Sequence, residues 1–133
     1  MNISLKHQRI LVTGASRGIG RAIARQLSES GAEVIIHYNS NRAEAESLLS
    51  RLKNPAHIEA CDLSQSTEVV GFIPRLVEKY GPLTALVNNA GISPMAPDTL
   101  PTGEWLQIWE KVMAVNSTAV GILTKEFIDQ AKP

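Results

Sequence analysis

The chain has 133 residues, with 13 Lys and Arg balanced by 13 Asp and Glu, and 44% of its residues are apolar. This length fits one domain, and a chain of this size can bury roughly two-thirds of its unfolded surface. The balanced charge argues against nucleic acid and anionic membranes as partners. We expect a cytoplasmic protein, because the chain has a single Cys and no secretory signal at its start. We expect no metal site, because the His and Cys residues lack metal-ligand spacing.

Short apolar runs alternate with amphipathic stretches along the chain. Strands are predicted at residues 9–13, 33–38, 57–63 and 83–87. Helices are predicted from apolar positions at helical spacing, in five groups: Ile19, Ala22, Ile23 and Leu27; Ala45, Leu48, Leu49 and Leu52; Val69, Ile73, Leu76, Val77 and Tyr80; Trp105, Ile108, Trp109 and Val112; and Ala119, Val120, Leu123 and Phe127.

Three local signals refine these helices. Asn41, followed three residues later by Glu44, is typical of a helix N-terminus. Pro74 lies inside the third group, which predicts a kink or a late helix start there. Gly31 and the Gly81-Pro82 pair are placed where helices end.

The order of elements, βαβαβαβ followed by helices, predicts an α/β fold with a doubly wound parallel sheet. The strands are apolar throughout instead of alternating, which is expected when both faces of a sheet are covered. Right-handed crossovers then place helices on both faces. Residues 1–133 form one partial domain in this interpretation.

The segment Val12-Thr13-Gly14-Ala15-Ser16-Arg17-Gly18-Ile19-Gly20 joins the first strand to the first helix. A helix N-terminus exposes N–H groups and a positive dipole end, which attract phosphate. Gly14 permits a tight turn, Gly18 lets the backbone approach a pyrophosphate, and Gly20 allows close packing of the helix. The residues do not match a P-loop, so an ATPase is excluded. A βα turn whose glycines serve geometry alone is the alternative.

Thr13 to Gly20 resembles the cofactor motif of the short-chain dehydrogenases/reductases. Asp62-Leu63 after the third strand, Asn88-Asn89-Ala90-Gly91 after the fourth, and Asn116 in Val115-Asn116-Ser117 resemble that family in order and rough spacing. The resemblance covers the whole chain but only the N-terminal half of the family's domain. It implies a Rossmann-like fold and an oxidoreductase acting on a small-molecule carbonyl or alcohol.

The end of the second strand indicates which dinucleotide binds. An acid there binds the ribose 2′-hydroxyl of NAD, whereas a nearby Arg accommodates the 2′-phosphate of NADP. Residues 37–42 contain no Asp or Glu. We therefore expect NADP(H), with Arg17 and Arg42 reaching the 2′-phosphate and Ser40 and Asn41 as neutral donors. A solvated Arg42 in a first helical turn is the alternative.

The resemblance assigns further roles near the cofactor. It implies that Asp62 contacts the adenine amino group, although a capping or loop carboxylate is the alternative. Asn88 would tie its loop to neighbouring strands, and Ala90 and Gly91 would leave room for the ribose. The predicted cofactor-binding residues are Gly14, Ser16, Arg17, Gly18, Ile19, Gly20, Ser40, Asn41, Arg42, Asp62, Leu63, Asn89, Ala90 and Gly91.

Catalysis in the family uses Ser, Tyr and Lys, with an Asn that orients the Lys through water, and Asn116 matches that Asn. Tyr38 and Tyr80 are followed four residues later by Arg42 and Thr84, so neither forms Tyr-x-x-x-Lys. The chain is therefore expected to be inactive alone and to stop before a fifth strand.

Three explanations stay open. The chain is a fragment of a full reductase, a half-domain that binds nucleotide without catalysis, or one half of a site completed by a second polypeptide. The strand at 83–87 would then lie at an unprotected apolar edge, which invites pairing with another chain. The alternative to the enzyme is accordingly a non-catalytic dinucleotide-binding module, or an interaction protein that assembles through this edge. A homo-oligomer or a complementing chain is the expected protein partner.

Overall fold

The computed structural model describes residues 2–133, in which parallel strands alternate with helices. The sheet has the order β3-β2-β1-β4, and every pair of neighbouring strands is parallel. The elements are β1 (Arg9–Val12), α1 (Gly18–Glu29), β2 (Glu33–Tyr38), α2 (Arg42–Leu49), β3 (Ala56–Ala60), α3 (Ser66–Val69), α4 (Phe72–Tyr80), β4 (Ala85–Val87), α5 (Thr102–Met113), the π-helical turn η1 (Ala114–Thr118) and α6 (Ala119–Ala131).

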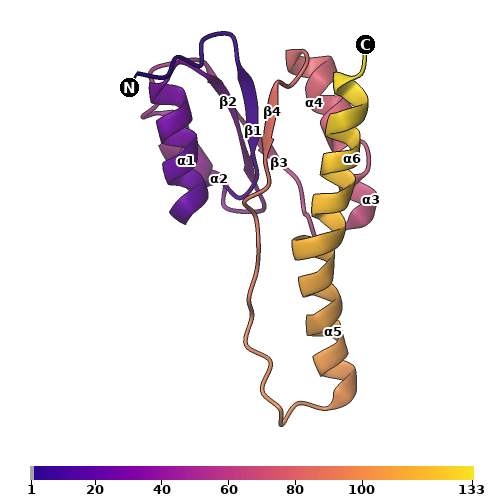
Figure 1. The fold of residues 1–133 in the computed structure, drawn as a ribbon. Coiled ribbons are helices and arrows are strands. Elements are labelled where there is room, and N and C mark those ends of the chain that lie inside the picture. The colour runs from indigo at the N-terminus through magenta and orange to yellow at the C-terminus, as the bar shows by residue number, and fades with distance from the viewer. Residues whose placement is uncertain (1) are drawn as a thin grey trace.

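Helices cover both faces of the sheet, with α1 and α2 on one side and α3, α4 and α6 on the other (Figure 1). Successive residues of a strand point to opposite faces. Accordingly Ile10 and Val12 pack in the core under α1 and α2, while Leu11 packs in the core under α4 and α6. The predicted doubly wound parallel sheet is therefore confirmed, and its two cores explain why the strands are apolar throughout.

The third predicted strand and the third predicted helix differ from the structure. The strand ends at Ala60, three residues early, and the chain turns at Asp62, whose side-chain carboxylate accepts from the Ser64 N–H. The predicted helix is two helices, separated at Gly71, whose φ of 87° is in the left-handed region. Pro74 lies in the first turn of α4, where a missing N–H leaves no bond unmade. The late helix start is confirmed.

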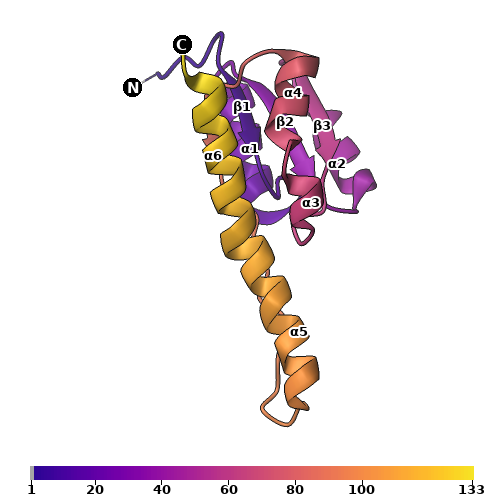
Figure 2. The same cartoon turned by 90° about the vertical axis from the view of Figure 1, so that its right-hand side faces the viewer.

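The last two predicted helices form one long rod, because α5 continues through η1 into α6. A π-helical turn of this kind commonly marks a functional site. The α5 end of the rod extends beyond the sheet, beside the loop that follows β4 (Figures 1 and 2). None of its residues is buried, and Trp105 stacks on Trp109 with ring centroids 5.4 Å apart.

Within the described residues, β4 pairs only with β1 and therefore lies at the edge of the sheet. Gln130 of α6 holds the chain just before this strand, since its side-chain amide donates to the Leu83 carbonyl and accepts from the Leu83 N–H. None of the helices in residues 2–133 combines the length and the apolar content that a membrane crossing requires.

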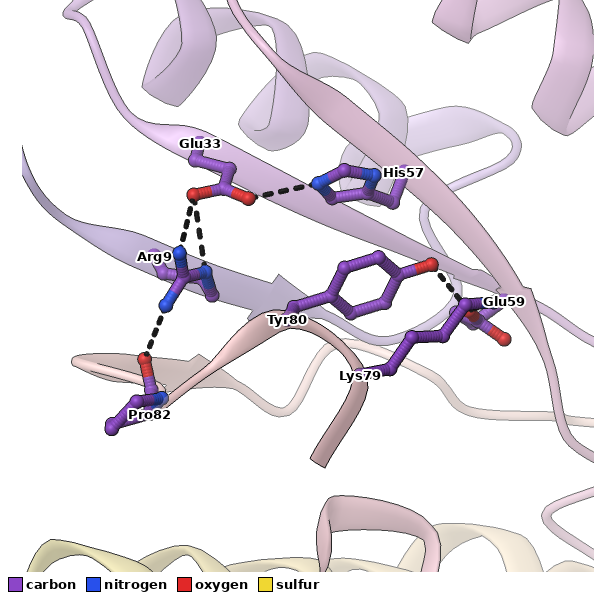
Figure 3. Close-up of polar contacts among 7 residues, drawn as sticks. All are labelled: Arg9, Glu33, His57, Glu59, Lys79, Tyr80 and Pro82. Atoms are coloured by element: carbon purple, nitrogen blue, oxygen red, sulfur yellow. Dashed lines mark hydrogen bonds and ion pairs between the residues drawn. The ribbon is translucent and has the colours of Figure 1, made fainter. Parts of the chain in front are cut away.

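A polar network crosses the amino-terminal ends of the strands, at the opposite end from the glycine-rich loop (Figure 3). The Glu33 carboxylate lies 2.9 Å from the Arg9 guanidinium and 2.8 Å from His57 Nε2. The His57 ring stacks on Tyr80, whose hydroxyl donates to Glu59. Burial works to raise the pKa of Glu33, but the hydrogen bonds from Arg9 and His57 outweigh it and lower that pKa.

Glu33→Gln is expected to lower the free energy of unfolding by about 1–2 kcal/mol at pH 7, because an ion pair and a hydrogen bond are lost. The contribution of Glu33 is complete above its unfolded pKa of about 4.5 and disappears as pH falls through the lower folded value. Urea unfolding should therefore show the gap between variant and wild type narrowing as pH falls below about 4.5.

The matched control is Glu29→Gln, which removes an exposed pair with Arg25 and should change stability by less than about 0.5 kcal/mol. A Glu33→Gln gap that stays constant between pH 7 and about pH 3 would show that the carboxylate does not stabilise the fold through its charge.

Candidate functional site

A cleft lies at the carboxyl ends of the strands, where ligands of parallel α/β sheets bind. It has a volume of about 740 Å³. The loops after all four strands form its walls, and one face of the rod formed by α5 and η1 closes it. Its lining residues are Gly14, Ser16, Arg17, Gly18, His37, Asn39, Asp62, Leu63, Ser64, Asn89, Ala90, Gly91, Ile92, Ser93, Pro94, Ile108, Lys111 and Val115.

The glycine loop opens this cleft at the start of α1. Gly14 and Gly18 have φ of 61° and 58°, a region that favours glycine. A Cβ on Gly18 would meet no atom within 4 Å, so the space beside it is open. The first turn of α1 contains no acidic residue, and its N–H groups have no acceptor earlier in the helix. The loop therefore offers an uncrowded N–H cradle for an anion.

Gly20 has a different role, because it lies against the loop instead of facing open space. A Cβ at Gly20 would come within 2.3 Å of the Gly14 carbonyl oxygen and 2.4 Å of Asn89 Nδ2. Only glycine allows α1 to begin this close to the end of β1. Gly20 thus shapes the cleft from behind, and it does not line it.

Thr13 and Asn89 tie the loops after β1 and β4 together. The Thr13 hydroxyl oxygen accepts from the backbone N–H groups of Asn89 and Ala90, both at 3.0 Å. The Asn89 side chain donates to the carbonyls of Thr13 and Gly14. The prediction that Asn88 makes this tie is wrong, because the Asn88 amide turns away and donates to Thr124 on α6.

His37 lies beneath the glycine loop and is 2% exposed. Its Nδ1 accepts from the Gly14 N–H at 2.9 Å, and its Nε2 lies 2.8 Å from the Cys61 carbonyl oxygen. Burial lowers the pKa of His37, although the Cys61 carbonyl acts in the other direction. Burial also raises the pKa of the Cys61 thiol to about 11, so this cysteine stays protonated at neutral pH.

Asp62, in the loop after β3, also lines the cleft. Its Oδ1 accepts from both the side-chain hydroxyl and the backbone N–H of Ser64, at 2.7 and 2.9 Å. These two bonds lower the pKa of Asp62 and keep it a charged acceptor. Asp62 therefore combines the loop-capping role, given above as the alternative, with a position in the cleft. Its contact with an adenine stays a prediction.

Asn116 lies in η1, beside the loop that follows β4. Its Oδ1 accepts from the Ile92 N–H and its Nδ2 donates to the Ile92 carbonyl, both at 2.8 Å. The two bonds hold the cleft wall at Ile92. The role of Asn116 toward a catalytic Lys stays a prediction.

The two arginines expected at a 2′-phosphate differ in position. Arg17 is exposed and lines the cleft. Arg42 does not line it, because its guanidinium pairs at 2.7 Å with Glu46 one turn later. The Asn41 side chain caps α2 by accepting from the Glu44 N–H, as its sequence position indicates. Of the other predicted residues, Ile19, Gly20, Ser40, Asn41 and Asn116 also lie outside the lining.

Several lining residues were not predicted as site residues from the sequence. Asn39 precedes the predicted Ser40, and Ser64 follows the predicted Leu63. Including one more residue on each side of the predicted motifs would have found both.

Ile108 was assigned to a helix, Lys111 lies within the same predicted helix, and Val115 was named only as a neighbour of Asn116. All three line the cleft because the rod formed by α5 and η1 lies against it. His37 carried one usable signal, since an imidazole in the middle of an apolar strand must find polar partners.

Comparison with known proteins identifies the family of this chain. The family model described as short chain dehydrogenase matches residues 8–132. A short-chain type dehydrogenase/reductase of Picea abies is 34% identical over 87% of this chain and 46% of its own length. A 3-oxoacyl-(acyl-carrier-protein) reductase of Staphylococcus aureus is 39% identical over 83% of this chain and 45% of its own length.

Solved structures that resemble this chain include a short chain dehydrogenase and a blue fluorescent protein. A short chain dehydrogenase from Burkholderia cenocepacia, in complex with NADP, has a TM-score of 0.84 and 32% identity, and the match covers 94% of this chain and 51% of that one. A blue fluorescent protein from a metagenomic library, in complex with NADPH, also has a TM-score of 0.84 and is 29% identical over 100% of this chain.

The chain belongs to the short-chain dehydrogenase/reductase family. It spans about half the length of the curated relatives that it matches.

Proposed function

We propose that this chain is the NADP(H)-binding part of a short-chain reductase that interconverts a small-molecule carbonyl and its alcohol. The observation that carries the proposal is Arg17, a cation on the wall of a cleft whose neighbouring strand end has no carboxylate in residues 37–42. The NADP complexes among the structural neighbours support the choice of dinucleotide.

The residues present fit such a cofactor. The open space at Gly18 and the first-turn N–H groups of α1 would hold the pyrophosphate. Arg17 would face the 2′-phosphate, since a guanidinium suits phosphate oxygens, and Asp62 would accept from the adenine amino group. When bound, the nicotinamide supplies the hydride chemistry. The chain's own residues bind and orient it, and Asn116 fixes the wall at Ile92.

Acid–base catalysis needs a group that faces the substrate. Tyr38 and Tyr80 do not line the cleft, and Tyr80 donates to Glu59 at the far end of the strands. This observation favours a second candidate, a dinucleotide-binding module without turnover of its own. Both candidates predict NADPH binding by the 133-residue chain, which is expected to be inactive alone. Carbonyl-dependent oxidation of NADPH by a protein that joins this chain to a segment with a Tyr-x-x-x-Lys motif would identify the reductase, and its absence would leave the binding module.

Arg17→Ala tests the cofactor assignment. Loss of charged hydrogen bonds to the 2′-phosphate should weaken NADPH binding about tenfold or more, with little change for NADH, which lacks that phosphate. Titration followed by nicotinamide fluorescence measures both affinities. Arg25→Ala is the control, because Arg25 lies on α1 outside the cleft and pairs with Glu29. Equal weakening of NADPH binding and NADH binding would show that Arg17 does not contact the 2′-phosphate.

A further inference from the structure

The His37 ring has a single arrangement that satisfies both of its nitrogens. The Gly14 backbone N–H can only donate, so Nδ1, at 2.9 Å, must be an unprotonated acceptor. The Cys61 carbonyl can only accept, so Nε2, at 2.8 Å, must carry the proton. The contacts therefore require a neutral imidazole with its hydrogen on Nε2.

This ring connects the loops at the carboxyl ends of three strands. Gly14 begins the glycine loop after β1, His37 belongs to β2, and Cys61 immediately precedes Asp62 after β3. The His37 carbonyl also accepts from the Ala15 N–H at 3.0 Å, so this one residue holds two successive residues of the glycine loop. The position of the loop therefore depends on His37.

The surroundings of the ring offer it no compensating charge. The Phe72 ring packs against it in a T-shaped arrangement with centroids 5.9 Å apart. Glu59, opposite His37 in the β3 register, is engaged by Lys79 and Tyr80. Within residues 2–133 no side chain is hydrogen bonded or ion-paired to His37; the titratable or charged groups on the adjoining segments are Arg17, Glu59, Cys61, Asp62, Arg75 and Lys111.

We propose that His37 is the positioning residue of the cofactor loop, and that protonation of its ring breaks the bond to Gly14 and releases the loop from His37. The inference rests on the proposed function, because it concerns the same cleft. A protonated Nδ1 would place N–H against N–H at Gly14, and the charge would be buried without a counter-ion.

The direction of the pH dependence follows from linkage. In an open loop the imidazole has its ordinary pKa of about 6.5, whereas in the closed loop burial lowers its pKa. Below about pH 6.5 the open state therefore binds a proton that the closed state excludes. Opening becomes easier as pH falls, by up to about tenfold per pH unit, and above that range His37 contributes no pH dependence.

Hydrogen exchange at the Gly14 amide tests the release directly. The protection factor in the wild-type chain should fall about tenfold or more between about pH 7.5 and about pH 5. His37→Asn supplies the control, since its side-chain oxygen can take the place of Nδ1 but cannot ionise. Its Gly14 protection should change less than about twofold. The same fall in both chains, or none in the wild type, would overturn the proposal.

Binding of NADP⁺ by calorimetry at about pH 7.5 tests positioning, with circular dichroism confirming that each variant folds. His37→Asn should keep the wild-type affinity within about threefold, whereas His37→Gln, whose amide reaches only the Nε2 position, should weaken it about tenfold. If NADP⁺ binding were weakened equally in both variants, His37 would contribute only packing, and the positioning role would be overturned.

Acid also protonates the 2′-phosphate, whose second pKa is about 6. Protonation of the ligand weakens binding to the wild type and to His37→Asn equally. When NADP⁺ affinity is followed as pH falls, only the loss by which the wild type exceeds His37→Asn therefore belongs to His37. A folded wild-type chain that binds no NADP⁺ at about pH 7.5 would refute the proposed function. Exchange at Gly14 would still decide, in that case, whether His37 holds the loop.

Discussion

Gly18→Asp is expected to abolish dinucleotide binding and to leave the fold intact. A Cβ at Gly18 meets no atom within 4 Å, and its φ of 58° lies in a region that Asp and Asn tolerate better than other side chains. The carboxylate would stand at the N-terminus of α1, in the space that we assign to the pyrophosphate. At about 5 Å and an effective dielectric constant of about 20, each pair of like charges costs about 3 kcal/mol, which corresponds to more than about 100-fold in affinity.

Gly18→Asn separates charge from shape, because the two side chains have nearly the same size. We expect the Asn variant to lose less than about tenfold in NADPH affinity, since it adds bulk and a slightly strained backbone but no repulsion. Fluorescence titration of both variants, with circular dichroism to confirm folding, gives the comparison. Unchanged binding by Gly18→Asp would mean that the glycine loop does not hold the phosphates.

The architecture could be predicted because its signals are local. Val34, Ile35 and Ile36 form a β-branched run that favours a strand covered on both faces. The glycines after Val12 favour a loop, and Gly14 and Gly18 have positive φ there. The order of strands and helices then restricts the topology, since parallel crossovers share one hand. These patterns suffice for the sheet and for the general location of the cleft.

The details of the site depend on contacts that no local pattern contains. Arg42 can reach either a ligand or Glu46 one turn away, and the structure shows the ion pair. Asn88 and Asn89 have the same side chain, and only the direction of the backbone after β4 decides that Asn89 meets Thr13. Lys111 lies about fifty residues after Asp62 in sequence. Both line the cleft because the rod formed by α5 and η1 lies against the loops at the ends of the strands.

Gly20→Ala is expected to destabilise the fold by about 2–3 kcal/mol. The added methyl would lie 2.3 Å from the Gly14 carbonyl oxygen and 2.4 Å from Asn89 Nδ2. The carbonyl belongs to the backbone and the amide is held by two hydrogen bonds, so neither can move without breaking the tie between the loops after β1 and β4. This strain exceeds the gain in helix propensity from Gly to Ala, which is about 1 kcal/mol.

Gly121→Ala provides the matched control, because it is the same substitution inside a helix with no atom within 4 Å of the new methyl. It should stabilise the chain by about 0.5–1 kcal/mol, so the two variants are expected to differ in sign. Urea unfolding of both measures the difference. Since Gly20 lies behind the glycine loop, Gly20→Ala should also weaken NADPH binding, whereas Gly121→Ala should not. A Gly20→Ala chain as stable as Gly121→Ala would show that α1 can withdraw from the loop at no cost, and the close approach at Gly20 would then not be what fixes the cleft.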